Sequence, residues 1–157
     1  MRSLSGAMRL RVATLAVALF VAVTAAGCSA SITIGATDAP TQVPGNITFG
    51  TSLDSKTWVV SGASTTFKTT DTIGWAARLT DSAKSSTLTL TLATVDSSGT
   101  ETVVDTETVN VTDQTDDIFG HIPDTALGAL GAGTYKMRYT RPSDGTVLAT
   151  GTVTITA

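Results

Sequence analysis

The chain has 157 residues, of which 10 are basic, 13 are acidic, one is a histidine and one is a cysteine, and its formal net charge is −3. A lone cysteine cannot form an intramolecular disulfide, and one cysteine with one histidine gives too few ligands for a zinc or copper site. No cofactor is expected. The length fits one domain, and the acidic balance argues against a nucleic-acid partner.

The first 28 residues run from a basic segment through an apolar one to small residues. Arg2, Arg9 and Arg11 precede the apolar run at 12–23, and small residues then lead to Cys28. This order is typical of a secretory signal peptide. The apolar run is shorter than the roughly 20 residues that span a bilayer, which argues against a retained membrane helix.

The end of this segment, Ala25-Ala26-Gly27-Cys28, resembles the lipobox of bacterial lipoproteins. The resemblance implies cleavage between Gly27 and Cys28, acylation of Cys28 with palmitate-type chains, and a membrane anchor on the extracytoplasmic side of the cell envelope. Two alternatives stay open. An ordinary signal peptidase could cut after Ala25 or Ala30 and release a secreted domain, and Cys28 could be an incidental thiol.

Removal of residues 1–27 would take away three basic residues and no acidic one. Seven basic and thirteen acidic residues would remain, a net charge of about −6. The next segment, 28–45, contains small residues, threonines, Pro40 and Pro44, and it cannot bury enough apolar surface to offset its ordering entropy. We predict a flexible, disordered tether there.

From 46 to 157 the side chains alternate with a period of two, which predicts β-strands. Leu88, Leu90 and Leu92 alternate with threonines, so the leucines are expected to face a core. The segment 73–79 alternates in the same way, with its even-numbered residues expected on the solvent face. Six to eight strands at this spacing predict one all-β, antiparallel sandwich domain.

Turn residues separate these segments. The loops at 96–99 and 141–145 are polar and end in glycine, which is typical of hairpin connections. A bulge is expected at Thr150-Gly151. The segment 124–130 predicts a single helical turn with Asp124 as its cap.

The stretch from Leu130 to Met137 resembles the turn and strand of an immunoglobulin-like sandwich that carries a tyrosine corner. The resemblance implies that Tyr135 bonds back to the preceding turn and that Trp75 packs between the sheets, both in structural roles. The corresponding group is the cysteine-free immunoglobulin-like or fibronectin-like domains of bacterial surface proteins.

Trp58 is the candidate binding residue. An exposed aromatic ring can stack on a sugar or anchor a protein partner. The competing interpretation is a core tryptophan.

Three other groups contain residue types that can take part in chemistry. His121 stands alone in a loop-like stretch, where a structural role is expected. Asp113, Asp116 and Asp117 cluster in one connection, which predicts a solvated acidic loop or, alternatively, a calcium site.

The third group is Asp105 and Glu107, which share one strand face and could pair as the carboxylates of a small hydrolase. A charged face turned to water is the simpler interpretation.

The sequence as a whole predicts a non-enzymatic, membrane-anchored lipoprotein whose domain binds or presents an envelope protein or glycan. The alternative is an inhibitor or regulatory subunit that plugs an extracytoplasmic enzyme with the loop at 112–130.

Overall fold

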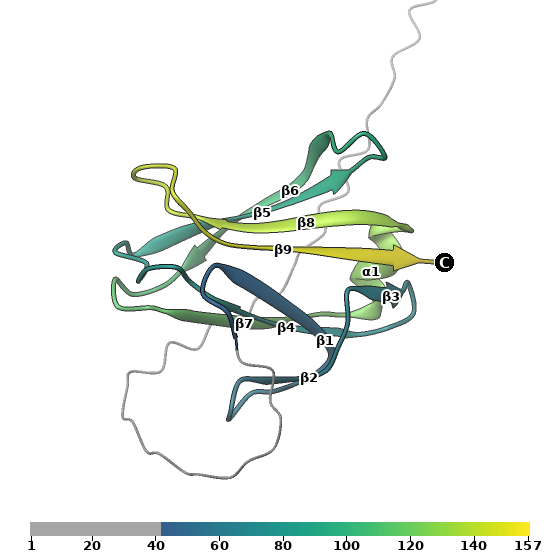
Figure 1. Cartoon of the computed structure of the whole chain (residues 1–157), viewed down its shortest axis with the longest axis horizontal. Coiled ribbons are helices and arrows are strands. Elements are labelled where there is room, and N and C mark those ends of the chain that lie inside the picture. The colour runs from purple at the N-terminus through teal and green to yellow at the C-terminus, as the bar shows by residue number, and fades with distance from the viewer. Residues whose placement is uncertain (1–41) are drawn as a thin grey trace, which may run out of the picture.

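A computed structural model describes residues 42–157, which form two stacked layers of strands (Figure 1). One layer has the order β6-β5-β8-β9 and the other β1-β4-β7, and a parallel contact between β1 and β9 joins them into one curled sheet. The predicted signal peptide, the lipidation site and most of the tether lie outside the described residues. The elements are β1 (Asn46–Asp54), β2 (Val59–Ala63), β3 (Thr66–Lys68), β4 (Ile73–Arg78), β5 (Thr87–Val95), β6 (Glu101–Asn110), β7 (Asp117–Ile122), α1 (Asp124–Leu130), β8 (Gly133–Thr140) and β9 (Val147–Thr156).

The prediction of an all-β, immunoglobulin-like sandwich is confirmed. Seven strands form the main path, and two short ones, β2 and β3, attach to β1 and β9. All pairs are antiparallel except β1 with β9 and β3 with β9.

The centre of the core is built by alternating residues of β5 and β8. Leu90 and Leu92 are buried and stand opposite Tyr139 and Met137 in the ladder between these strands. From the other layer, Trp75 is fully buried, with its ring centroid 5.7 Å from that of Tyr139. Residues from both layers therefore meet in one apolar cluster.

Strand β4 departs from the predicted alternation, because five of its six residues are buried. Gly74 and Ala76, which were expected to face solvent, are covered by the hairpin of β1 and β2. A Cβ atom on Gly74 would stand 2.8 Å from the Cβ of Leu53, so only glycine permits this close approach. A second, smaller apolar cluster forms on this outer face around Val60, Ala76 and Phe119.

The bulge that was expected at Thr150-Gly151 is not there. The ladder between β8 and β9 is regular at both residues, and its irregularity falls instead beside Thr140, which pairs with Val147. Gly151 lies in the buried row of β9, and glycine is needed there because a Cβ would stand 2.8 Å from the Cβ of Ile47.

The short helix α1 closes one end of the sandwich, where Ala126 and Leu127 are buried (Figure 1). Its cap is Pro123 and not Asp124, which lies in the first turn. The buried Tyr135 follows on β8, and its hydroxyl donates to the carbonyl oxygen of Leu130 at 2.6 Å. This is the backbone contact of a tyrosine corner, and it ties the helix end to the sheet.

Candidate functional site

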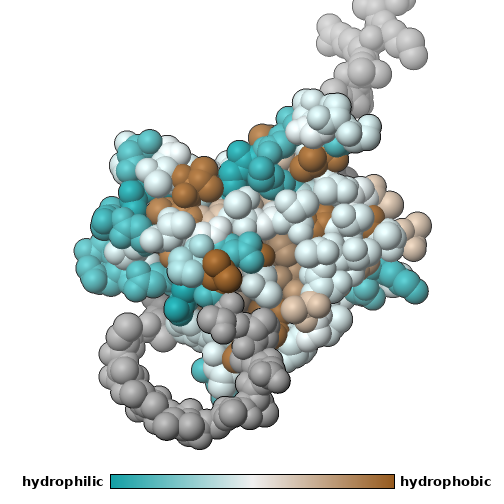
Figure 2. All heavy atoms as spheres, viewed as in Figure 1, coloured by the Kyte–Doolittle hydropathy of each residue, from teal (hydrophilic) through white to brown (hydrophobic). Residues whose placement is uncertain are grey.

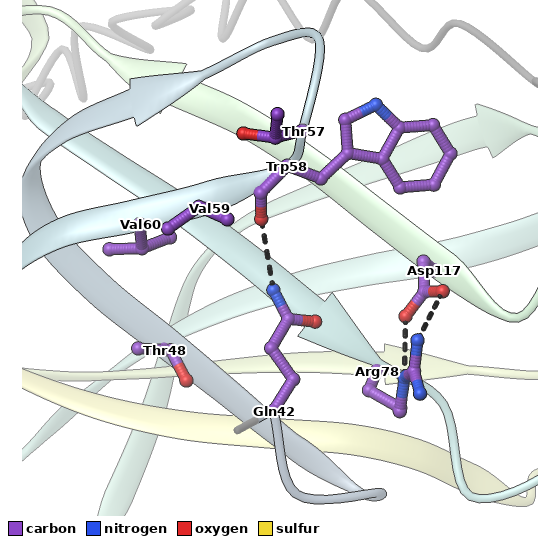
Figure 3. Close-up of a pocket in the computed structure, with 8 residues that line it drawn as sticks. All are labelled: Gln42, Thr48, Thr57, Trp58, Val59, Val60, Arg78 and Asp117. Atoms are coloured by element: carbon purple, nitrogen blue, oxygen red, sulfur yellow. Dashed lines mark hydrogen bonds and ion pairs between the residues drawn. The ribbon is translucent and has the colours of Figure 1, made fainter. Parts of the chain in front are cut away.

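A pocket of about 230 Å³ opens on the outer face of the β1-β4-β7 layer, beside the β1–β2 hairpin (Figure 3). Its walls come from four strands or their ends and from the first described residues of the chain. We call it the Trp58 pocket. It is lined by Gln42, Thr48, Thr57, Trp58, Val59, Val60, Arg78 and Asp117.

Trp58 has an unusual backbone conformation. Its φ angle is 60°, in the left-handed region that bulky residues rarely adopt. The tight turn before it holds this conformation, because the N–H of Trp58 donates to the carbonyl oxygen of Asp54 at 2.7 Å. The Asp54 carboxylate also accepts from the N–H groups of Lys56 and Thr57, and these bonds lower the pKa of Asp54.

The side chain of Trp58 is half-buried against the outside of the sandwich. Its ring centroid lies 4.7 Å from that of Phe119, at a tilt of 40°. Its carbonyl oxygen accepts a hydrogen bond from the side-chain amide of Gln42 at 3.3 Å. Trp58 is therefore neither a residue of the main core nor a freely exposed ring, since it forms one wall of the pocket and packs on an aromatic neighbour.

Another wall of the pocket carries an ion pair. Arg78 and Asp117 face each other in the β4–β7 register, and two N–H groups of the guanidinium donate to the two carboxylate oxygens at 2.8 Å each. The bidentate pair raises the pKa of Arg78 through its bonds to Asp117. Because the two charges cancel, this wall is neutral overall while still presenting polar atoms to the pocket.

Asp117 does not lie in the acidic loop that the sequence predicted. It lies on β7 and pairs with Arg78, whereas Asp113 and Asp116 remain in the turn before this strand. Among residues 42–157 the structure brings together no group of three or more His, Cys, Asp or Glu side chains that could hold a metal ion.

His121 was placed in a loop and lies instead on β7, exposed. The whole stretch at 112–130 is likewise not an open loop, because after one turn it forms β7 and α1. Ile118, Ile122 and Leu127 from this stretch are buried in the core. These side chains are therefore part of the core, and the inhibitor alternative stays a prediction.

Asp105 and Glu107 lie on the edge strand β6, and their placement also corrects the sequence interpretation. Each stands opposite a core leucine, Leu92 and Leu90, so both carboxylates point toward the sandwich interior and not toward bulk water. One oxygen of Glu107 is buried and has no hydrogen-bond partner within residues 42–157, and burial, followed by the charge of Asp105, raises the pKa of Glu107. Asp105 accepts the N–H of Thr106 at 2.8 Å.

Charges that point inward on an edge strand oppose the addition of another strand. The space next to them is about 10 Å³, which holds about one water molecule and no substrate. These two carboxylates are better explained as protection of the edge than as a hydrolase pair.

The sequence could not single out Gln42, Thr48 and Arg78 as pocket residues. Arg78 and Asp117 are 39 positions apart and meet only through the β4–β7 register. Gln42 comes from the segment that was predicted to be a tether.

The chain matches no family model, and no curated protein matches it. Among solved structures it is similar to an immunoglobulin-like protein from Pseudomonas aeruginosa, with 15% identity and a TM-score of 0.46, over 73% of this chain and 95% of that one. Within residues 42–157, no helix has the length and apolar character to cross a membrane.

Proposed function

We propose that this protein is a lipid-anchored lipoprotein of the bacterial cell envelope, and that its immunoglobulin-like domain is a non-catalytic binding module whose site is the Trp58 pocket. In this scheme residues 1–27 are removed, Cys28 carries the anchor, 28–45 is the tether and 46–157 is the binding domain. The partner is an envelope component, which the domain meets on the extracytoplasmic side.

The observation that carries the proposal is the strained backbone of Trp58 beside a polar pocket. A left-handed conformation at a bulky residue costs on the order of 1–3 kcal/mol and persists where the surrounding structure holds it, which is common at binding sites. Here the Asp54 turn, Gln42 and Phe119 hold Trp58 in place. The result is an aromatic wall of fixed orientation, prepared before any ligand arrives.

The position of the pocket fits an anchored protein. Gln42 lines the pocket and is only 14 residues from Cys28. A flexible segment of that length has a root-mean-square span on the order of 20 Å. The anchor would therefore keep the pocket close to the membrane and the material next to it.

Intact mass spectrometry of the protein extracted from its native membrane tests the anchor. We expect a mass that corresponds to residues 28–157 plus a diacylglycerol group, and we expect Cys28→Ala to leave the membrane fraction. Ser29→Ala, one residue further, is the matched control and should stay membrane-bound. An unmodified mass that begins at Ala26 or Ser31, or a Cys28→Ala variant that remains in the membrane, would contradict the proposal.

A further inference from the structure

The chemical character of the Trp58 pocket indicates what it can bind, and the following inference rests on the proposed function of that pocket. Five of its eight lining residues are polar or charged, and the two charges form one bidentate pair. A charged ligand would have to break the bond between Arg78 and Asp117 or enter without a counter-charge. A neutral ligand meets neither cost.

An apolar ligand is also disfavoured. It would cover the outer atoms of the ion pair, the hydroxyl groups of Thr48 and Thr57 and the oxygen of the Gln42 amide without offering them hydrogen bonds. Buried polar groups that lose water without gaining a partner cost about 1–3 kcal/mol each. The ligand should therefore carry several hydroxyl groups of its own.

The third requirement is a flat apolar surface. Figure 3 shows the indole ring of Trp58 projecting beyond Val59 and Val60, on the side of the pocket where Asp117 lies. Phe119, a member of the outer apolar cluster, packs against this ring with the two centroids 4.7 Å apart. A pyranose ring has an apolar C–H face that lies flat on an indole, and hydroxyl groups around its rim that reach the polar wall.

Size and surroundings agree with a single sugar ring. The pocket volume of about 230 Å³ lies below the roughly 300–1,000 Å³ of sites for drug-sized ligands. The large apolar residues that are exposed in the described part of the chain are four valines, namely Val43, Val103, Val104 and Val147. On the face shown in Figure 2, apolar residues occur as separate spots and not as one continuous patch of the kind that marks a protein interface.

We propose that the Trp58 pocket binds one neutral pyranose unit of an envelope glycan, with the sugar ring against Trp58 and its hydroxyl groups on the Arg78–Asp117 pair. Trp58 then provides the stacking surface, and the ion pair provides orientation. The tether brings the pocket to the glycan that lies next to the membrane.

The test is a titration of the detergent-solubilised mature protein with methyl glucoside, methyl galactoside, methyl mannoside and N-acetylglucosamine, with glucuronate as the anionic probe. Tryptophan fluorescence is a suitable readout, because the other tryptophan, Trp75, is fully buried. We expect at least one neutral sugar to give a saturable change at millimolar concentration and glucuronate to bind at least tenfold more weakly.

Three variants assign the binding to the pocket, with amide NMR shifts as the readout where Trp58 is replaced. Trp58→Ala should weaken binding at least tenfold, and so should Arg78→Lys, which keeps the charge but loses the bidentate geometry. Ser55→Ala, in the same hairpin but outside the pocket lining, should bind like the wild type. Failure of every neutral sugar to bind, or equal binding by Trp58→Ala, would overturn the inference.

A second measurement separates this inference from the proposed function. The mature protein and its Trp58→Ala variant are each incubated with purified envelope glycan and, separately, with glycan-free envelope proteins. Glycan binding that depends on Trp58 supports both proposals. Trp58-dependent binding to the proteins alone refutes the sugar and keeps the binding module, whereas no dependence on Trp58 in either case refutes both.

Discussion

Replacing Tyr135 by phenylalanine removes one hydroxyl group and leaves the ring in place. That hydroxyl donates to the carbonyl oxygen of Leu130 at 2.6 Å and lies 3.2 Å from that of Gly131. A neutral hydrogen bond contributes about 0.5–1.5 kcal/mol, and both carbonyls are only half-buried, so water can replace the lost donor. We therefore expect Tyr135→Phe to lower the free energy of unfolding by about 1 kcal/mol, which is about 4 °C in Tm for a domain of this size.

Tyr139→Phe is the matched control on the same strand and the same face. The Tyr139 hydroxyl is buried and has no hydrogen-bond partner among the described residues, and burial, followed by the charge of Glu107, raises its pKa well above the usual range. Its removal should leave Tm unchanged or raise it, because an unpaired buried hydroxyl is a cost. Thermal unfolding followed by circular dichroism compares the two variants. If Tyr139→Phe lost as much stability as Tyr135→Phe, the reasoning from hydrogen-bond partners would be refuted.

Two further predictions concern the edge strand and the hairpin. Burial and the charge of Asp105 raise the pKa of Glu107 above its ordinary value of 4.5 in the folded state. The protonated side chain therefore contributes stability below pH 4.5, and this contribution is lost as the pH rises through the raised pKa. Glu107→Gln should therefore melt at a higher temperature than the wild type at pH 7, and the difference should close near pH 4; a variant less stable at every pH would contradict this. Gly74→Ala should cost about 1–3 kcal/mol because its new Cβ would stand 2.8 Å from Leu53, while Gly128→Ala, with open space around it in α1, should stabilise by about 0.5–1 kcal/mol. Denaturant unfolding measures both, and equal effects would contradict the packing of the hairpin on β4.

The alternation of side chains was sufficient to predict the fold class. The leucines of β5 and the aromatic residues of β8 show a period of two because one face of each strand is buried, and that pattern is local in the sequence. The tyrosine corner could be anticipated for the same reason, since Tyr135 and Leu130 are five residues apart.

The predicted solvent exposure was wrong for the strands whose second face is also covered. Strand β4 was expected to have one solvent-exposed face. That face is covered by the hairpin of β2 and the second half of β1, which leaves the ladder with β4 after Gly50. Nothing in the sequence of β4 predicts that this hairpin packs on its outer face. For Asp105 and Glu107, the register with β5 decided which face they share, and a shift of one residue would have reversed it.

Local sequence patterns predict the export signal and the lipid anchor at Cys28, and they were sufficient for the all-β class and most of the core, because each depends on neighbouring residues or on a short period. The site, in contrast, depends on the tertiary fold. Arg78, Asp117 and Trp58 meet through strand pairing and the folding of one hairpin across a sheet. Such contacts join residues that are far apart in the chain, and no local sequence pattern predicts them.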